Sequence, residues 1–241
     1  MTQRILLWAG VAIALSLTVA AAAWLYARST TAQLFGELVD RVETSEPVVA
    51  LTFDDGPMPG FTDEILAILE REQVHATFFL VGEAIAAYPG ETERIVAAGH
   101  EVGNHSYSHR RMVLIPYDSV ADELQRTDQL IRAAGYTGPI RFRPPYGKKL
   151  VNLPRYLARE GVTSITWDVA PDSYGDPAPD RERLVRTTLE QVRPGSIVLL
   201  HVMFAVRRNS MDALPDIIRG LKDRGYRFLT VSEMLEYRDP K

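Results

Sequence analysis

Apolar and polar residues alternate along this chain in blocks that predict strands followed by helices. From Pro47 onward, short apolar runs rich in β-branched and aromatic residues precede segments whose apolar residues recur at helical spacing. Repeated strand–helix units with continuously apolar strands are typical of parallel α/β folds. Strands are predicted at 48–53, 76–81, 101–103, 140–143, 163–169, 197–201 and 227–230, and helices at 62–72 (with Thr62 as the N-cap), 84–88, 91–98, 118–134, 153–160, 181–191, 211–224 and from Ser232.

The number of strand–helix units favours a closed barrel of strands. Seven or so units on a single core indicate an α/β barrel of parallel strands more than an open sheet. In such barrels the chemistry lies at the C-terminal ends of the strands. We therefore expect functional side chains just after the apolar runs.

The first residues follow a different pattern. No charged residue occurs from Ile5 to Ala27, and a helix over this stretch is roughly 35 Å long at about 1.5 Å per residue, enough to cross a bilayer core. Trp24 and Tyr26 suit a membrane interface. We predict an uncleaved signal anchor at 1–28, with a cleaved signal peptide as the alternative; either exports the rest of the chain.

A tether at 29–46 is expected to link this segment to a catalytic domain at 47–241. Its apolar residues at positions 34, 35, 38, 39 and 42 follow a helical period and predict a short amphipathic helix.

Composition narrows the function classes. The 241 residues contain no cysteine, which excludes disulfides, thiolate metal sites and cysteine nucleophiles. The formal net charge is -4, and the sequence has no cluster of Lys and Arg residues of the kind that binds nucleic acid.

Three polar fragments follow apolar runs. These are Asp54-Asp55-Gly56, the histidine pair His105 and His109, and His201. The pair has the i, i+4 spacing of metal ligands on one helical turn. Two imidazoles and one of the two carboxylates form a three-ligand metal site that leaves room for water and substrate, and the spare groups can move protons.

Each fragment also has a purely structural interpretation. The Asp pair can cap a turn, the two histidines can be surface residues, and His201 can be a satisfied core residue. Arg143 ends a strand and can hold a carboxylate by paired hydrogen bonds. Trp167 and Leu199 can wall a small apolar pocket, whereas His75 and His100 are expected to be structural.

The ordered set of motifs resembles the polysaccharide deacetylase family, which is carbohydrate esterase family 4 with the NodB homology domain. The strings are Thr-Phe-Asp-Asp-Gly at 52–56, His-Ser-x-x-His at 105–109, Arg-x-Pro-Tyr-Gly at 143–147 and Leu-Leu-His at 199–201. They span about 48–235. The resemblance implies a distorted (β/α)7 barrel of parallel strands that binds a divalent metal, commonly zinc.

The resemblance also implies roles for individual residues. Asp55, His105 and His109 would bind the metal, and Asp54 would be the general base. Arg143 would orient Asp54, the Tyr146 amide would help to hold the oxyanion, and His201 would be the general acid. Trp167 and Leu199 would line the acetyl-methyl pocket.

Two positions depart from the family pattern. The carboxylate that tunes the acid histidine is displaced, so that Asp172 or Asp168 must serve, and we favour Asp172. The residue after His201 is Val202, where many members of the family have Asp. These departures affect the pH optimum and the rim that meets the sugar, and they leave the ligands and base intact.

We therefore predict an exported, membrane-anchored, monomeric N-deacetylase of polymeric N-acetylated sugars. Its metal would be Zn²⁺, with Co²⁺, Ni²⁺ or Mn²⁺ as alternatives, and its polymer peptidoglycan, a chitin-like oligomer or poly-N-acetylglucosamine. The alternatives are an O-acetyl esterase on xylan-type polymers, a non-catalytic carbohydrate-binding homologue, a non-haem iron oxygenase and a structural envelope protein.

Overall fold

Strand β2 (Val48–Asp54) is central to the sheet, and every one of its residues is buried. In the computed structural model, which describes residues 2–173 and 179–238, β2 pairs in parallel with β3 (Thr77–Leu80), β6 (Ser196–Leu200) and β7 (Arg227–Leu229). Strand β4 (Glu101–Asn104) pairs with β3 on its far side. The carboxyl ends of β2, β4 and β6, where the polar motifs follow, thus share one edge.

Single bridges close this sheet into a distorted barrel. Phe142 pairs with Asn104 of β4 and with Ser164 of β5 (Ser164–Ile165), and Val169 pairs with Val198 of β6. The prediction of a parallel α/β barrel is confirmed. The predicted strand at 140–143 is reduced to the bridges of Phe142, and the one at 163–169 to Ser164–Ile165. At the end of β5, the Arg143 guanidinium, in place of a neighbouring strand, bonds the carbonyl oxygens of Ile165 and Thr166.

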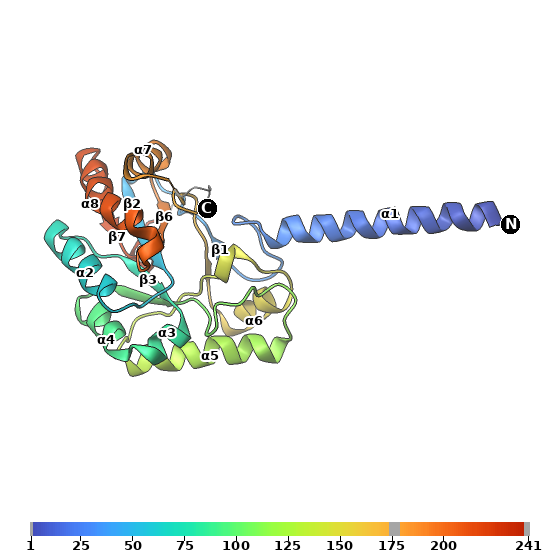
Figure 1. Ribbon diagram of the computed structural model, residues 1–241, viewed down its shortest axis with the longest axis horizontal. Helices are drawn as coiled ribbons and strands as arrows, with labels where there is room; N and C mark the ends of the chain where they lie inside the picture. Colours follow the sequence, from blue (N-terminus) through green and yellow to red (C-terminus); the bar gives the residue numbers. More distant parts are fainter. Residues whose placement is uncertain (1, 174–178, 239–241) are drawn as a thin grey trace.

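Helices surround the strands, and Figure 1 shows them outside the sheet, with α1 extending away as a separate rod. Val49, Leu51 and Phe53 of β2 pack in the large cluster that includes residues of α2 and α8. The alternate residues Val48 and Ala50 pack in a second cluster with strand residues such as Ile197. The helices are α1 (Thr2–Ala27), α2 (Phe61–Glu72), α3 (Gly82–Ala87), α4 (Pro89–Ala97), α5 (Tyr117–Ala133), α6 (Asn152–Glu160), α7 (Arg181–Gln191), α8 (Arg208–Asp223) and α9 (Val231–Leu235).

Two helix starts differ from the prediction. Thr62 is not the N-cap of α2: Gly60 is, and the Thr62 hydroxyl lies inside the first turn, where it donates to the Met58 carbonyl oxygen. Helix α9 begins one residue before Ser232, because Thr230 and Glu233 form a reciprocal capping box that satisfies both backbone amides.

The predicted amphipathic helix in the 29–46 segment is wrong. Leu38–Val39 instead form strand β1, which pairs in parallel with β5. The Val42 amide donates to the Gly195 carbonyl oxygen, and both Val39 and Val42 are buried. Pairing with two strands and burial of these side chains stabilise an extended chain over a helix.

Because this segment packs closely against Gly195, we expect a substitution at Gly195 to destabilise the protein. Its φ is 77°, and a Cβ there would lie 1.8 Å from the Val42 carbonyl oxygen. At Gly225, φ is 84° but no heavy atom lies within 4 Å of the corresponding Cβ. Gly195→Ala should therefore reduce the free energy of unfolding by about 1–3 kcal/mol more than Gly225→Ala, as measured by urea denaturation. Equal losses would show that only the backbone conformation matters.

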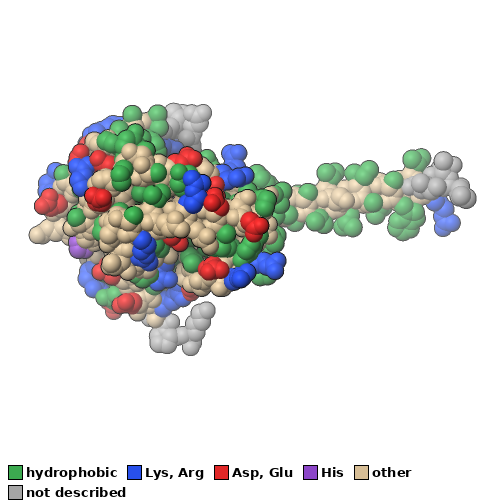
Figure 2. Space-filling view, turned by 90° about the horizontal axis from the view of Figure 1, so that it is seen from below, with side chains coloured by type: hydrophobic (Ala, Val, Ile, Leu, Met, Phe, Trp, Pro, Cys, Tyr) green, Lys and Arg blue, Asp and Glu red, His purple; other side chains and the backbone are tan. Residues whose placement is uncertain are grey.

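Helix α1 is long and apolar enough to cross a membrane. The segment Leu6–Ala27 has a mean hydropathy of 2.1, and no residue of its most apolar stretch is buried inside the protein. Apolar side chains project from it along its length in Figure 2. Helix α1 thus has the length and composition of a membrane anchor or a signal segment.

Candidate active site

Asp54 and Asp55 face the same cleft because the backbone turns sharply between strand and loop. Asp54 is the last residue of β2, and the alternation of the strand places it on the same side as Val48 and Ala50. Asp55 and Gly56 follow with φ values of 68° and 62°. This left-handed pair re-aims the chain, so that adjacent carboxylates need not point in opposite directions.

The histidine pair lies on a loop and not on a helical turn, contrary to the i, i+4 interpretation. His105 follows β4, and both Ser106 (φ 65°) and His109 (φ 53°) have left-handed backbones. Glu123 of α5 accepts hydrogen bonds from the amides of Tyr107 and Ser108 at 2.9 and 2.8 Å. These charge-assisted bonds from a buried carboxylate fix the loop that carries both imidazoles.

Asp55, His105 and His109 form a group suited to a metal ion. One ligand atom from each lies within 4.8 Å of the others. His105 Nε2 is 3.7 Å and His109 Nε2 is 3.1 Å from Asp55 Oδ1. That oxygen is buried and has no partner with hydrogen-bond geometry among the described residues. A buried lone pair facing two imidazole nitrogens matches the requirement of a divalent cation.

The ionisation states agree with this assignment. Burial raises the pKa of Asp55, but the neighbouring imidazoles, His109 above all, lower it to about 2. Burial lowers the pKa of His105, against the charges of Asp54 and Asp55, and favours the neutral ring. His105 Nδ1 lies 2.8 Å from the Arg143 carbonyl oxygen, so Nδ1 donates and Nε2 keeps its lone pair for a ligand.

Arg143 holds Asp54 in a buried ion pair. Its Nη1 donates to Asp54 Oδ1 at 2.6 Å and to the Thr52 hydroxyl at 2.8 Å. Burial lowers the pKa of the guanidinium, and the Asp54 carboxylate opposes that shift. With one oxygen bound to Arg143, the other, Asp54 Oδ2, lies 3.6 Å from His105 Nε2.

The structure places Asp172, and not Asp168, beside His201. Asp172 Oδ1 lies 3.1 Å from His201 Nδ1, and Asp172 Oδ2 accepts from the His201 amide at 2.7 Å. Burial lowers the pKa of His201, but the Asp172 hydrogen bond and charge raise it overall. Asp168 instead accepts hydrogen bonds from Ser196 and from the Ile197 amide.

The remaining predicted residues line the same cleft, which has a volume of about 390 Å³. Trp167 and Leu199 contribute largely buried apolar surface. Tyr146 has a left-handed backbone (φ 59°), and its half-exposed ring lies 4.7 Å from the His109 ring. His75 and His100 pack against each other outside this cleft, and burial lowers the pKa of His100 to about 4.

Several residues that shape the site carry no recognisable motif in the sequence. Ser210 of α8 donates to Asp172 Oδ2 at 2.9 Å, and Arg207 donates to the Asp172 carbonyl oxygen. Arg28 and Lys148 also line the cleft. No motif marks these residues, since they meet the site only through folding. The chain order offers one signal: Lys148 directly follows the Arg-x-Pro-Tyr-Gly string.

The family is decided by comparison with known proteins. The model of the polysaccharide deacetylase family matches residues 41–165. The chain belongs to this family. The matched region begins before the predicted domain boundary at 47 and contains the two Asp, the two His and Arg143.

Curated relatives act on cell-wall and chitin-type sugars. The chain is 36% identical to a peptidoglycan-N-acetylglucosamine deacetylase of Bacillus cereus, over 78% of this chain and 68% of that protein. It is 35% identical to a chitooligosaccharide deacetylase of Sinorhizobium fredii, over 78% and 92%. It is 34% identical to the peptidoglycan-N-acetylmuramic acid deacetylase PdaC of Bacillus subtilis, over 82% of this chain but only 40% of that protein.

Solved structures share the fold. A crystal structure of the peptidoglycan N-acetylglucosamine deacetylase Bc1960 superposes with a TM-score of 0.77 and 31% identity, covering 84% of this chain and 94% of that one. A carbohydrate esterase family 4 pseudoenzyme of Bacillus anthracis superposes at 0.75 with 30% identity, covering 84% and 70%. The fold alone therefore does not decide activity, and the site residues must carry the argument.

Proposed function

We propose that this protein is a metal-dependent N-deacetylase of polymeric N-acetylated sugars. One observation carries the proposal: the Asp55–His105–His109 ligand set shares its cleft with an Arg-held carboxylate and an Asp-held imidazole. Together these groups supply a metal site, a base and an acid. Relatives that hydrolyse acetamide groups of peptidoglycan and chitooligosaccharides support the reaction class.

Two residues of the chain, Asp54 and His201, each carry out one proton transfer of the reaction. When bound by Asp55, His105 and His109, a divalent cation supplies carbonyl polarisation and a water of lowered pKa. Asp54, positioned by Arg143, accepts the proton of the attacking water. The Tyr146 amide donates to the developing oxyanion. His201 then donates a proton from its second ring nitrogen to the departing sugar nitrogen, which leaves acetate and a free amine.

Zinc is the proposed native metal, since two imidazoles and a carboxylate with open positions suit catalytic Zn²⁺. We further propose that α1 anchors the protein in a membrane with the catalytic domain outside the cytoplasm.

The alternative function of a non-haem iron oxygenase is weaker. Besides the three candidate ligands, the site contains a further carboxylate, Asp54, and a further imidazole, His201, and hydrolysis uses both.

Acetate release tests the function and its rivals together. Purified protein loaded with zinc should release acetate from peptidoglycan, a chitin oligomer or poly-N-acetylglucosamine. Release from acetylated xylan alone would indicate the O-acetyl esterase. Binding without release from any of these polymers would indicate a non-catalytic homologue.

The contact between Asp172 and His201 predicts a change in pH dependence. A general acid must be protonated, so the rate falls as pH rises through the pKa of His201, which Asp172 raises. Asp172→Asn should therefore move the basic limb of the kcat/KM profile to lower pH and slow hydrolysis at alkaline pH on the order of tenfold. Asp168→Asn is the matched control and should leave that limb in place. An unmoved limb in the Asp172 variant would mean that His201 works without this partner.

A further inference from the structure

The end of α1 is built into the wall of the catalytic cleft. Ala27 is fully buried, and its carbonyl oxygen accepts the Lys149 amide at 3.0 Å. Lys149 Nζ, itself buried, donates to the Ser29 carbonyl oxygen at 2.5 Å, and the Thr166 hydroxyl donates to that of Thr30. Arg28 and Thr30 both line the cleft. The residues that directly follow the apolar span are therefore hydrogen-bonded to the wall of the cleft.

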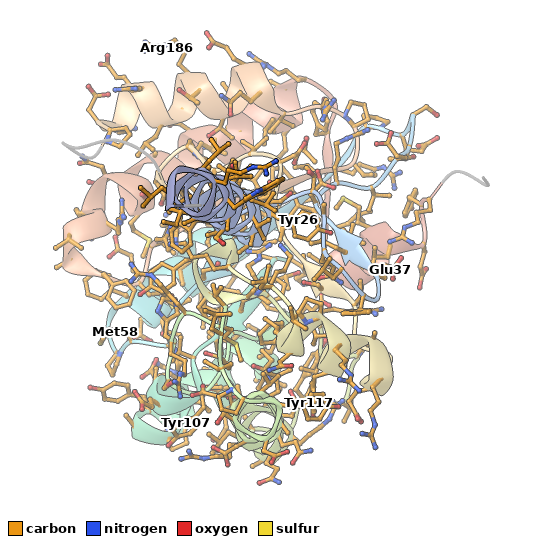
Figure 3. The ribbon with its side chains drawn as sticks, turned by 90° about the vertical axis from the view of Figure 1, so that its right-hand side faces the viewer. Tyr26, Glu37, Met58, Tyr107, Tyr117 and Arg186 are labelled. Carbon is orange, nitrogen blue, oxygen red and sulfur yellow. The ribbon has the colours of Figure 1, made fainter. Side chains whose placement is uncertain are left out.

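This connection determines which face of the domain meets a membrane. Figure 3 looks down α1 from its far end, and the helix rises from the middle of the face that the viewer sees, with Tyr26 near its base. If α1 spans a bilayer, this face lies against the headgroups. Trp24 and Tyr26 lie at the depth where aromatic residues collect, and the polar layer beyond the hydrocarbon core is several ångströms thick on each side. The cleft then opens at headgroup depth.

Three cations gather at this edge of the cleft, and we call Arg28, Arg111 and Lys148 the cationic rim. Lys148 Nζ lies 5.0 Å from the centre of the Trp24 ring, and Arg28 Cζ lies 6.0 Å from it. Lys148 Nζ and Arg111 Cζ also lie 5.8 and 5.1 Å from the centre of the Tyr146 ring.

The rim has no acidic partners within the described parts of the chain: none of its three cations forms an ion pair there. Burial lowers the pKa of Lys148, and the charges of Arg111 and Arg28 lower it further. Mutual repulsion of this kind is relieved by a bound anion. The Tyr146 ring, which lies against Lys148 and Arg111, also packs on the metal-ligand candidate His109. An anion bound by these cations therefore lies next to the site, with only the Tyr146 ring between them.

Exposed apolar side chains occur in the cleft that the rim borders and in the loop that carries Arg111. Among the described residues outside α1, the two most exposed large hydrophobic residues are Leu114 (84%) and Val206 (83%). Val206 lines the cleft, and Leu114 lies two residues beyond Met112, which pairs with Lys149. Apolar side chains next to cations are the composition of a surface that rests in a lipid interface.

We propose that the cationic rim is a phosphate subsite at the membrane surface, and that the substrate is an N-acetylated glycan joined to a membrane lipid through phosphate. This inference rests on the proposed deacetylase function of the same cleft and adds the substrate class. A phosphate in the rim would hold the sugar that follows it near Asp54 and the ligand set. Arginine and lysine side chains both suit a phosphate, the former by paired hydrogen bonds.

The test uses the full chain, loaded with zinc and reconstituted in a zwitterionic bilayer. Two substrates carry the same N-acetylated oligosaccharide on the same lipid tail, one through phosphate and one through a neutral ether. We expect the wild type to prefer the phosphate-linked glycan. Arg28→Gln combined with Lys148→Gln should reduce the ratio of the two kcat/KM values at least tenfold, mainly through KM. Arg186→Gln on α7, an exposed arginine outside the cleft, is the matched control.

A second arm identifies the source of the phosphate. The ether-linked glycan is assayed with and without anionic phospholipid in the bilayer. A rate increase with anionic lipid that the double variant removes would assign the rim to phosphates of bulk headgroups; a change confined to the phosphate-linked glycan assigns it to the substrate. Equal losses on both glycans in both bilayers, or no loss at all, would overturn the subsite.

The deacetylase function is judged separately, from wild-type activity on a soluble chitin oligomer. Acetate release there together with an unchanged selectivity ratio in the double variant rejects the rim alone. Absence of release from the soluble oligomer and from both glycolipids rejects the proposed function and the subsite that rests on it.

Discussion

Asp54→Asn should reduce kcat by about 10²- to 10⁴-fold while the protein keeps its metal. The carboxylate of Asp54 is bound at one oxygen by Arg143, whereas the candidate ligand set uses its neighbour Asp55. An amide can still accept the Arg143 hydrogen bond but cannot take a proton from water. Acetate release and metal content per chain, the latter by atomic emission, measure the two effects separately.

Asp55→Asn is the matched control, because it changes the adjacent carboxylate in the same way. It should lose most of the bound metal and, with it, activity. If instead Asp54→Asn loses the metal and Asp55→Asn retains it, the ligand and the base have been assigned the wrong way round. Because Arg143 is fully buried, the melting temperature of both variants should be followed, so that loss of folding is not mistaken for loss of chemistry.

Removal of the metal should abolish acetate release. In the described parts of the chain, Asp55, His105 and His109 are the one set of three His, Asp or Glu side chains whose ligand atoms all lie within 4.8 Å of one another. Dialysis against a chelator should leave less than about 1% of the activity, and added Zn²⁺ or Co²⁺ should restore it.

Two histidine variants make this test specific. His109→Ala should bind metal weakly and stay inactive after zinc is added. His75→Ala changes a histidine that packs against His100 away from the cleft, and it should respond to chelation and zinc as the wild type does. Full turnover by a preparation shown to be free of metal would contradict a metal-dependent hydrolase.

The order of strands and helices could be predicted because each is coded by a local pattern. Buried strands are continuous apolar runs, and the helices repeat apolar residues at helical spacing. The segment at 34–42 shows where the pattern fails. Its apolar residues fit a helix, but pairing of Leu38–Val39 with β5 and burial of Val42 favour an extended chain. Such pairing depends on residues far away in the sequence, which periodicity does not register.

The candidate site could be predicted as a set of residues, but not in its geometry. Asp54, His105 and His201 stood out because polar groups followed apolar runs. The i, i+4 spacing of His105 and His109 suggested a helical turn, yet Glu123 of α5 holds them on a loop with left-handed residues. From the sequence, the choice between Asp168 and Asp172 as the partner of His201 depended on a shift of one position relative to the family pattern.

By itself, the sequence determined the α/β class, the apolar N-terminal span and the kinds of groups available for catalysis, since these follow from composition and short-range order. The tertiary structure alone decided which groups meet. It placed Asp172 on His201, Arg143 on Asp54, and the end of α1 with Arg28 in the wall of the cleft. These contacts join segments up to 136 residues apart, as between Thr30 and Thr166, and only closure of the barrel brings them within hydrogen-bond distance.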